Sequence, residues 1–110
     1  MNSLKKAGMQ RHGWAVGKTA EFLNLTPQEA QFVEVKLALA AGVRQLRERR
    51  GVTQAALAKQ LGSSQSRIAK MEAADRSVTV DLMTRSLLAI GATPGEIAKL
   101  IKRAEARRSA

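Results

Sequence analysis

The sequence predicts an all-α fold in a single domain, and three observations lead to this prediction. The length of 110 residues is enough for one domain with a modest core. Aromatic residues are few, so the core must consist mainly of Leu, Val, Ile, Ala and Met. These side chains suit close-packed helices better than a sheet, which favours β-branched and aromatic residues. Apolar residues recur at helical spacing, and no segment alternates as a strand would.

The first 36 residues are expected to form two units before the main domain. Residues 1–17 contain three glycines and no periodicity, which predicts a flexible basic arm. Residues 18–36 are predicted to form an N-terminal helical extension. Within it, residues 18–25 can form a short helix that buries Phe22 and Leu23.

Two four-residue segments predict helix starts. Residues 26–29 (TPQE) and 93–96 (TPGE) each place a threonine at the N-cap, a proline at the first helical position and a glutamate three residues after the cap. That arrangement is a capping box, in which the missing N–H of the proline costs nothing. Helices are therefore expected to begin at residues 27 and 94.

The helix from residue 27 is predicted to reach Arg50, with Gly51 as its C-terminal cap. Gly42 interrupts the apolar pattern, which allows either one bent helix or two abutting helices. Three short helices follow: one capped by Thr53 that runs to residue 61, one capped by Ser63 or Ser64 that runs to about residue 73, and one capped by Thr79 that runs to about residue 90. The last helix is expected to dissolve into a basic tail at residues 106–110, so that residues 37–105 form the main domain.

Residues 54–73 contain a pattern that is typical of a helix-turn-helix. Four apolar residues can converge between its two helices: Leu57, Leu61, Ile68 and Met71. Ala58 is small where the second helix must cross, and Gly62 permits the positive φ of a tight turn. An αα-hairpin without a nucleic-acid role can satisfy the four apolar positions, but it seldom needs Ala58 and Gly62 as well. The pattern therefore favours DNA binding.

Composition excludes several classes of function. The net charge of +10 and the sequence pI near 11.2 favour a polyanionic partner, although residues 21–40 contribute −2. There is no cysteine and His12 is the only histidine, so a disulfide scaffold, a thiolate zinc site and a multi-histidine metal site are excluded. No set of catalytic residues is present, so we expect no enzyme activity and no cofactor. No apolar run approaches the roughly 20 residues that cross a bilayer, and a cytoplasmic protein without a membrane partner is expected.

The segment LRERRGVTQAALAKQLGSSQSRIAKME resembles the DNA-binding domain of lambda-repressor-like (Cro and XRE-type) regulators. The resemblance extends from Val43 to about Leu100, and it implies a five-helix domain whose third helix lies in the major groove of double-stranded DNA. The family usually has a glycine soon after the glutamate that matches Glu72. Here residues 73–75 (AAD) replace it, so the loop after the recognition helix is expected to differ.

Specific roles follow from the resemblance and from side-chain chemistry. The residues expected to contact bases are Ser64, Gln65, Ser66 and Arg67. Phosphate contacts are expected around them from Gln54, Arg49, Arg50, Lys59, Lys70 and Arg76. The resemblance also pairs Arg47 with Glu72 as a structural ion pair. A glutamine amide can bond adenine at N6 and N7, and Arg67 can bond guanine or hold a phosphate instead.

Regulators of this kind usually bind as homodimers, which implies a near-palindromic operator. The dimer surface is expected on the last two helices, at Met83, Leu87, Leu100 and Ile101, unless these residues form the core of one protomer. The expected action is to occupy a promoter and repress transcription.

A second function remains open beside the first. Residues 14–40 resemble the leader of HigA-like antitoxins, which bind a toxin as well as their own promoter. Alternatively, Phe22, Leu25, Phe32 and Val33 simply cap the domain core.

RNA binding is less favoured because single-stranded recognition generally needs stacking aromatic residues. Attraction of the basic tail to a membrane surface is a generic property of basic segments.

Overall fold

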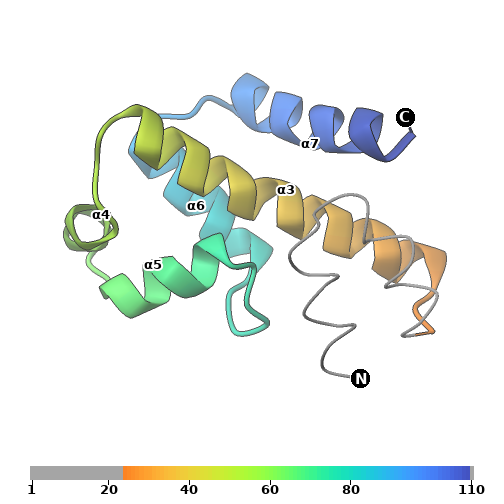
Figure 1. Ribbon diagram of the computed structural model, residues 1–110, viewed down its shortest axis with the longest axis horizontal. Helices are drawn as coiled ribbons and strands as arrows, with labels where there is room; N and C mark the ends of the chain where they lie inside the picture. Colours follow the sequence, from red (N-terminus) through yellow and green to blue (C-terminus); the bar gives the residue numbers. More distant parts are fainter. Residues whose placement is uncertain (1–23, 110) are drawn as a thin grey trace.

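The computed structural model describes residues 24–109, which contain five helices and no strand (Figure 1). The helices are α3 Pro27–Arg49, α4 Gln54–Leu61, α5 Gln65–Glu72, α6 Val80–Ile90 and α7 Pro94–Ser109. The all-α prediction is therefore confirmed for this part of the chain. The predicted arm at residues 1–17 and most of the predicted helix at 18–25 lie outside the described residues.

The capping boxes are formed at both predicted positions. The Glu29 backbone N–H donates to Thr26 Oγ1 at 3.1 Å, and the Thr26 N–H donates to Glu29 Oε1 at 2.8 Å. The same reciprocal bonds join Thr93 and Glu96 at the start of α7. Each box satisfies two N–H groups that the helix itself leaves unpaired.

Gly42 does not divide the first described helix. α3 runs without interruption from Pro27 to Arg49, so the alternative of two abutting helices was wrong. The glycine serves packing instead, because a Cβ at residue 42 would lie 2.4 Å from Leu100 Cδ1. α7 can cross this close to α3 only where α3 has no side chain.

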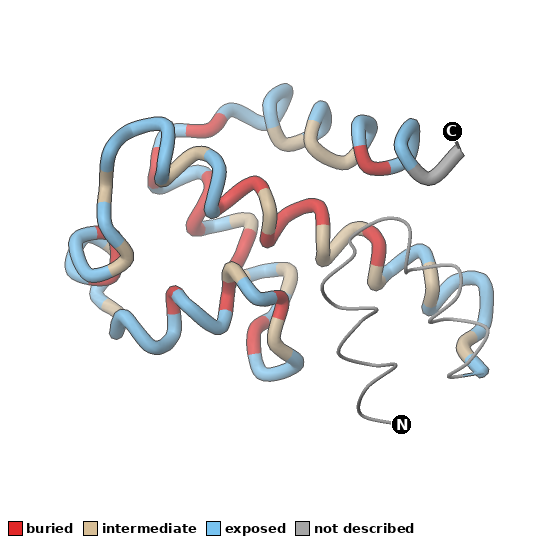
Figure 2. Tube along the Cα trace, viewed as in Figure 1, coloured by how far each residue is buried: buried red, intermediate tan, exposed pale blue. Residues whose placement is uncertain are grey.

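α3 is the central helix of the fold. It packs against α5, α6 and α7, while α4 packs mainly against α5. Figure 1 shows α5 and α7 on opposite sides of α3. Buried residues gather on the faces of α3, α4, α5 and α6 that point toward one another (Figure 2). The largest apolar side chains that are fully buried are Leu39, Val43, Leu57, Ile68, Met71, Val78, Met83 and Leu87.

Two expectations about apolar residues need correction. Met83 and Leu87 have no exposed surface, so they belong to the core of one protomer and cannot form a dimer surface. Phe32 is 56% exposed and therefore does not cap the core. On α6 the exposed large apolar side chain is Leu88, at 45%.

The end of the chain also differs from the prediction. α7 continues through the expected basic tail to Ser109. Residues 104–107 are Ala, Glu, Ala and Arg, all good helix formers, and a basic side chain near a helix C-terminus, such as that of Arg107, interacts favourably with its dipole. None of the helices in the described residues is long and apolar enough to cross a membrane.

Candidate nucleic-acid interface

α4 and α5 meet at a tight corner made by three residues. Gly62 has φ +65°, and the next N–H, that of Ser63, donates to the Ala58 carbonyl at 2.8 Å. Ser64 then caps α5 by accepting a hydrogen bond from the Arg67 N–H at 3.1 Å. Ala58 is 3% exposed beneath the crossing. The corner thus fixes the direction in which α5 leaves α4.

α5 buries one side and exposes the other. Ile68 and Met71 are buried, and the helical repeat places Ser66 directly opposite them. Gln65 and Arg67 flank this outer face, and both are exposed. The three residues therefore share one accessible helical turn at the start of α5.

Ser64 has a different role from its three predicted partners. Its Oγ is the N-cap acceptor of α5, so its hydroxyl proton and one lone pair remain to bond a base or a phosphate. The structure thus brings Gln65, Ser66 and Arg67 together as outward-facing side chains and gives Ser64 a helix-capping function beside them.

The far end of α5 is fastened to α3 by an ion pair between Arg47 and Glu72. Arg47 Nε lies 2.6 Å from Glu72 Oε2, and Arg47 Nη2 donates to Glu72 Oε1 at 3.1 Å. Only 12% and 6% of the two side chains are exposed. A two-point bond of this kind fixes orientation as well as distance. The hydrogen bond to Glu72, aided by its charge, raises the pKa of Arg47 above its ordinary value although burial opposes this.

Two further bonds extend this cluster to the start of α4. Arg47 Nη1 donates to the Val52 carbonyl at 2.8 Å, and Gln54 Nε2 donates to Glu72 Oε1 at 3.1 Å. Gln54, expected to contact phosphate, therefore uses one of its two amide N–H groups inside the protein and keeps one for a ligand.

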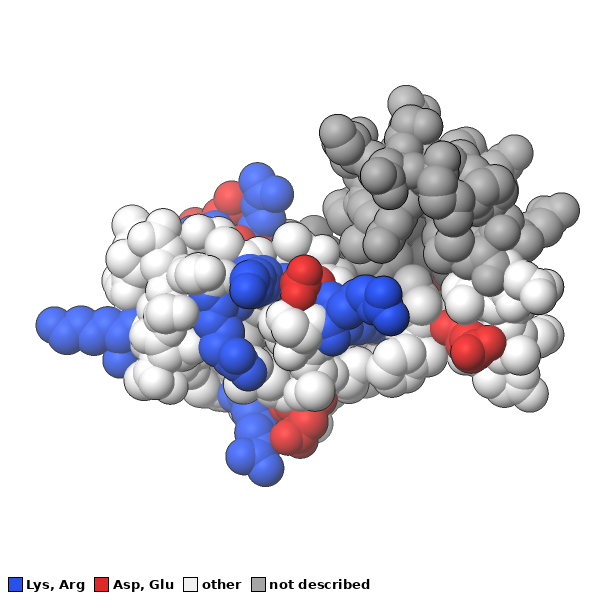
Figure 3. All heavy atoms as spheres, turned by 90° about the horizontal axis from the view of Figure 1, so that it is seen from below, with Lys and Arg blue, Asp and Glu red and all other residues white. Residues whose placement is uncertain are grey.

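The remaining basic residues fall into two groups. Lys59, Lys70 and Arg76 are exposed on α4, on α5 and in the loop after α5. Figure 3, seen from below Figure 1 where α5 lies, shows basic side chains spread across this face with acidic ones between them. Arg49 and Arg50 lie elsewhere, near α6 and α7. Arg49 lines a groove with Leu100, and a Cβ at Gly91 would lie 2.4 Å from Arg50 Nη1.

Arg44 is a basic residue of this face that sequence reasoning missed. It lines a surface hollow with Gln54, with Ala69 on α5, with Ala73 at the C-cap of that helix, and with the Arg47–Glu72 pair. Its side chain is 64% exposed and forms a weak surface pair with Glu48, at 3.2 Å. The signal was available, because Arg44 lies three residues before Arg47 on the same face of a helix.

The loop after α5 has an alanine in the left-handed conformation, although the sequence has no glycine at residues 73–75. Ala74 takes the left-handed conformation, with φ +56°, and the next N–H, of Asp75, donates to the Lys70 carbonyl at 2.9 Å. Asp75 in turn accepts hydrogen bonds from the Ser77 hydroxyl and N–H, which lower the pKa of its carboxyl. An alanine therefore occupies a position where glycine is usual, at a steric cost of about 1–2 kcal/mol.

Comparison with known proteins identifies the domain that contains this site. A protein-family model described as a helix-turn-helix domain matches residues 38–100, more than half of the chain. No curated protein and no solved structure matches the chain.

Proposed function

Since the chain belongs to the helix-turn-helix domain family and thereby carries a DNA-binding domain, we propose that it is a sequence-specific transcriptional regulator. In this proposal it acts in the cytoplasm as a repressor, with α5 in the major groove of its operator. The observation that carries the proposal is the exposed first turn of α5. Its side chains point outward, while the corner at Gly62 and the Arg47–Glu72 pair hold the two ends of the helix.

The chemistry of this turn suits base edges. The amide of Gln65 can bond adenine N6 and N7 together, and the guanidinium of Arg67 can bond guanine O6 and N7. Ser66, directly opposite the buried side, is short and can donate or accept, which lets the helix approach the floor of the groove closely. We assign base readout to these three residues, with the Ser64 hydroxyl as a further donor.

Phosphate contacts would surround this turn. We assign them to the remaining N–H of Gln54 at the positive end of α4, to Lys59, Lys70 and Arg76, and to Arg44. Arg49 and Arg50 lie near α6 and α7 and contribute only to the long-range attraction of DNA. We further propose a homodimer on a near-palindromic operator. Its protomer contact would include Leu88, the exposed large apolar side chain of α6.

Base readout is tested by a salt titration of DNA affinity for the wild type and Gln65→Ala. The two duplexes are the region upstream of its own gene and a random sequence. Loss of a bidentate base contact removes about 1–3 kcal/mol of discrimination, while the salt slope stays the same because no phosphate contact is lost. If the wild type binds both duplexes equally and weakly, the proposed function is wrong.

The phosphate role of Arg44 is tested in the same titration with Arg44→Ala. Both duplexes should bind more weakly, and the slope of log affinity against log salt should fall by about 0.9. Arg85→Ala is the matched control, because Arg85 makes the same kind of exposed pair with a residue four positions away, Asp81, but lies on α6. An equal effect of the two variants would show general attraction and not a contact.

The antitoxin function remains a second candidate, and the exposure of Phe32 favours it. This side chain lies on the part of α3 that precedes the matched domain, and an exposed phenylalanine is typical of a protein-binding surface. In this alternative residues 18–36 form a toxin-binding unit and residues 37–105 the DNA-binding domain, although α3 runs through the boundary. A toxin-like reading frame beside this gene would support it, and an isolated gene would count against it.

A further inference from the structure

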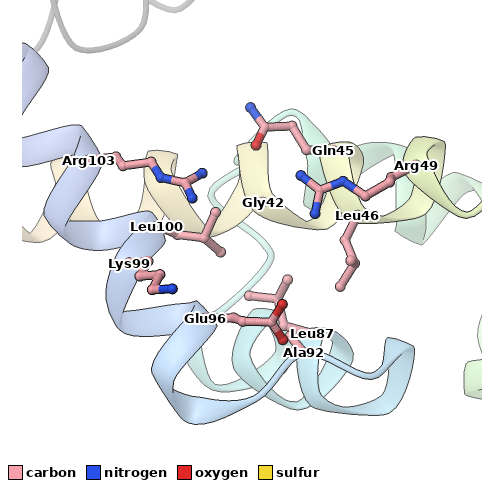
Figure 4. Close-up of a pocket in the computed structure, with 10 residues that line it drawn as sticks. All are labelled: Gly42, Gln45, Leu46, Arg49, Leu87, Ala92, Glu96, Lys99, Leu100 and Arg103. Atoms are coloured by element: carbon pink, nitrogen blue, oxygen red, sulfur yellow. The ribbon is translucent and has the colours of Figure 1, made fainter.

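A groove lies between α3 and α7, on the side of α3 that faces away from α5 (Figures 1 and 4). The accessible apolar part of its floor is made by the half-buried Leu46 and Leu100, and the fully buried Leu87 lies beneath them. One end is closed where α7 crosses α3 at Gly42. The groove is therefore a feature of the helix packing itself.

Three cations border this floor. Arg49 extends from α3 and Arg103 from α7, and in Figure 4 their guanidinium groups point toward the space between the two helices. Lys99 lies one turn before Arg103 on α7. None of the three forms an ion pair with any described residue. Like charges brought together in this way repel unless an anion lies between them.

The single acidic residue of the groove offsets only one of its three positive charges. Glu96 lines the same wall, but its carboxylate is bound to the Thr93 N–H at 2.9 Å as part of the capping box. That hydrogen bond, with help from Arg50 and Arg49, lowers the pKa of Glu96. The groove thus keeps a net positive charge over an apolar floor.

We propose that this groove binds an acidic segment of a partner protein, with a large apolar side chain on the leucine floor and carboxylates against Arg49, Lys99 and Arg103. The partner class follows from charge complementarity, which sets specificity and association rate. The proposal goes beyond DNA binding and concerns a different surface, which stays accessible when α5 is on DNA.

Other occupants fit less well. A small molecule is normally buried over most of its surface, whereas this groove is open to solvent. Residues 1–20 of this chain carry only basic charges, four in all, and would be repelled. A second copy brings a net charge of +10 against the same face. Nucleic acid has no side chain for the apolar floor, and the operator lies on the other side of α3.

The test is a titration of the ¹⁵N-labelled full chain with a short peptide of leucine and glutamate, followed by amide chemical shifts. We expect the shifts to concentrate at residues 42–49 and 92–103. Arg103→Glu should weaken binding about tenfold, whereas Lys102→Glu should weaken it no more than about twofold. Lys102 is the matched control, because it is exposed, lies beside Arg103 on α7 and does not line the groove.

Three results would overturn the proposal. Shifts centred on α4 and α5 would show that the peptide only imitates DNA. Equal weakening by Arg103→Glu and Lys102→Glu would show attraction to net charge alone. Equal binding of a peptide with serine in place of leucine would show that the apolar floor plays no part. Operator affinity is measured in parallel, so that a failure of this proposal is distinguished from a failure of the DNA-binding proposal.

Discussion

Glu72 joins three parts of the domain through one carboxylate. It accepts two hydrogen bonds from Arg47 on α3 and one from Gln54 on α4, while it belongs to the last turn of α5. Only 6% of its side chain is exposed, so its charge has lost most of its hydration. Removing one partner would leave the other charge nearly buried and unpaired, and that penalty exceeds the net value of the intact pair.

We therefore predict strong coupling between Arg47 and Glu72. Arg47→Met and Glu72→Gln should each lower the free energy of unfolding by about 3 kcal/mol. The double variant should lose less free energy of unfolding than the two single variants lose together, and this difference should exceed about 1 kcal/mol. Urea denaturation of the wild type, the two single variants and the double variant completes this double-mutant cycle. The variant Gln54→Ala shows how much of the Glu72→Gln effect comes from the hydrogen bond between Gln54 and Glu72. Additive losses would mean that the ion pair does not hold α5 to α3.

The role of a residue was predictable from the sequence where its partners lie within a few positions along the chain. The caps at Thr26 and Thr93 are satisfied within four residues, so their pattern fixes them locally. The cap of α5 is equally local, but the sequence left Ser63 and Ser64 as alternatives, and the structure places it at Ser64. The location of Arg49 and Arg50 depends instead on where α6 and α7 pack, which the basic run at residues 47–50 does not reveal.

At the scale of the elements, Gly42 shows why the sequence left two alternatives open, one continuous helix or two abutting helices, of which the structure has the first. In isolation a glycine weakens a helix by about 1 kcal/mol relative to alanine, which made an interruption plausible. The contact that explains it comes from Leu100, far along the sequence, and no local pattern contains that information. Helix existence and caps were thus predictable, whereas the packing reason for this glycine was not.

A comparison of Gly42 and Gly95 tests whether Gly42 is required for packing. Both glycines lie in helices and neither has a positive φ, so alanine can replace either without backbone strain. At residue 42 a Cβ would lie within 3.3 Å of Leu100 Cγ and both its methyl groups, so overpacking of about 1–3 kcal/mol outweighs the gain in helix propensity of about 1 kcal/mol. At residue 95 the nearest atom is Thr93 Oγ1 at 3.8 Å, and only the gain remains.

Thermal unfolding followed by circular dichroism should therefore show a lower Tm for Gly42→Ala and a higher Tm for Gly95→Ala. Leu100→Val in the Gly42→Ala background should restore part of the loss, because it removes atoms from the crowded contact. Stabilisation by Gly42→Ala would mean that Leu100 turns away freely and that α7 is not held by this crossing.

At the scale of the whole molecule, the two sides of α3 carry different surfaces. The side with α5 presents Gln65, Ser66 and Arg67 beside scattered cations, and the other side presents the groove with Arg103. Composition predicted a polyanionic partner from the total charge, but it could not divide that charge between two faces. The division depends on the helix arrangement around α3, which is a property of the tertiary fold.

The charge of the whole molecule also predicts its behaviour in acid. As the nine carboxylates are protonated, the formal net charge rises from +10 toward +19, His12 aside, and self-repulsion increases. Hydrogen bonds from the backbone lower the pKa values of Glu29 and Glu96 below the ordinary glutamate value of 4.5. Because these pKa values are lower in the folded state, the stability they supply is present above pH 4.5 and is lost as the pH falls through the lowered values.

We accordingly predict that the Tm stays level from neutral pH to about pH 5 and then falls steeply. The variant Glu29→Gln with Glu96→Gln keeps both capping acceptors, because a glutamine also completes a capping box. At neutral pH this double variant should therefore have nearly the wild-type Tm. Between pH 5 and pH 2 its Tm should fall less than that of the wild type. Both proteins are measured by circular dichroism at one ionic strength. If the two curves fall together, the two caps have no part in the acid sensitivity, which then comes from net charge and from the other paired carboxylates, Glu72 and Asp75.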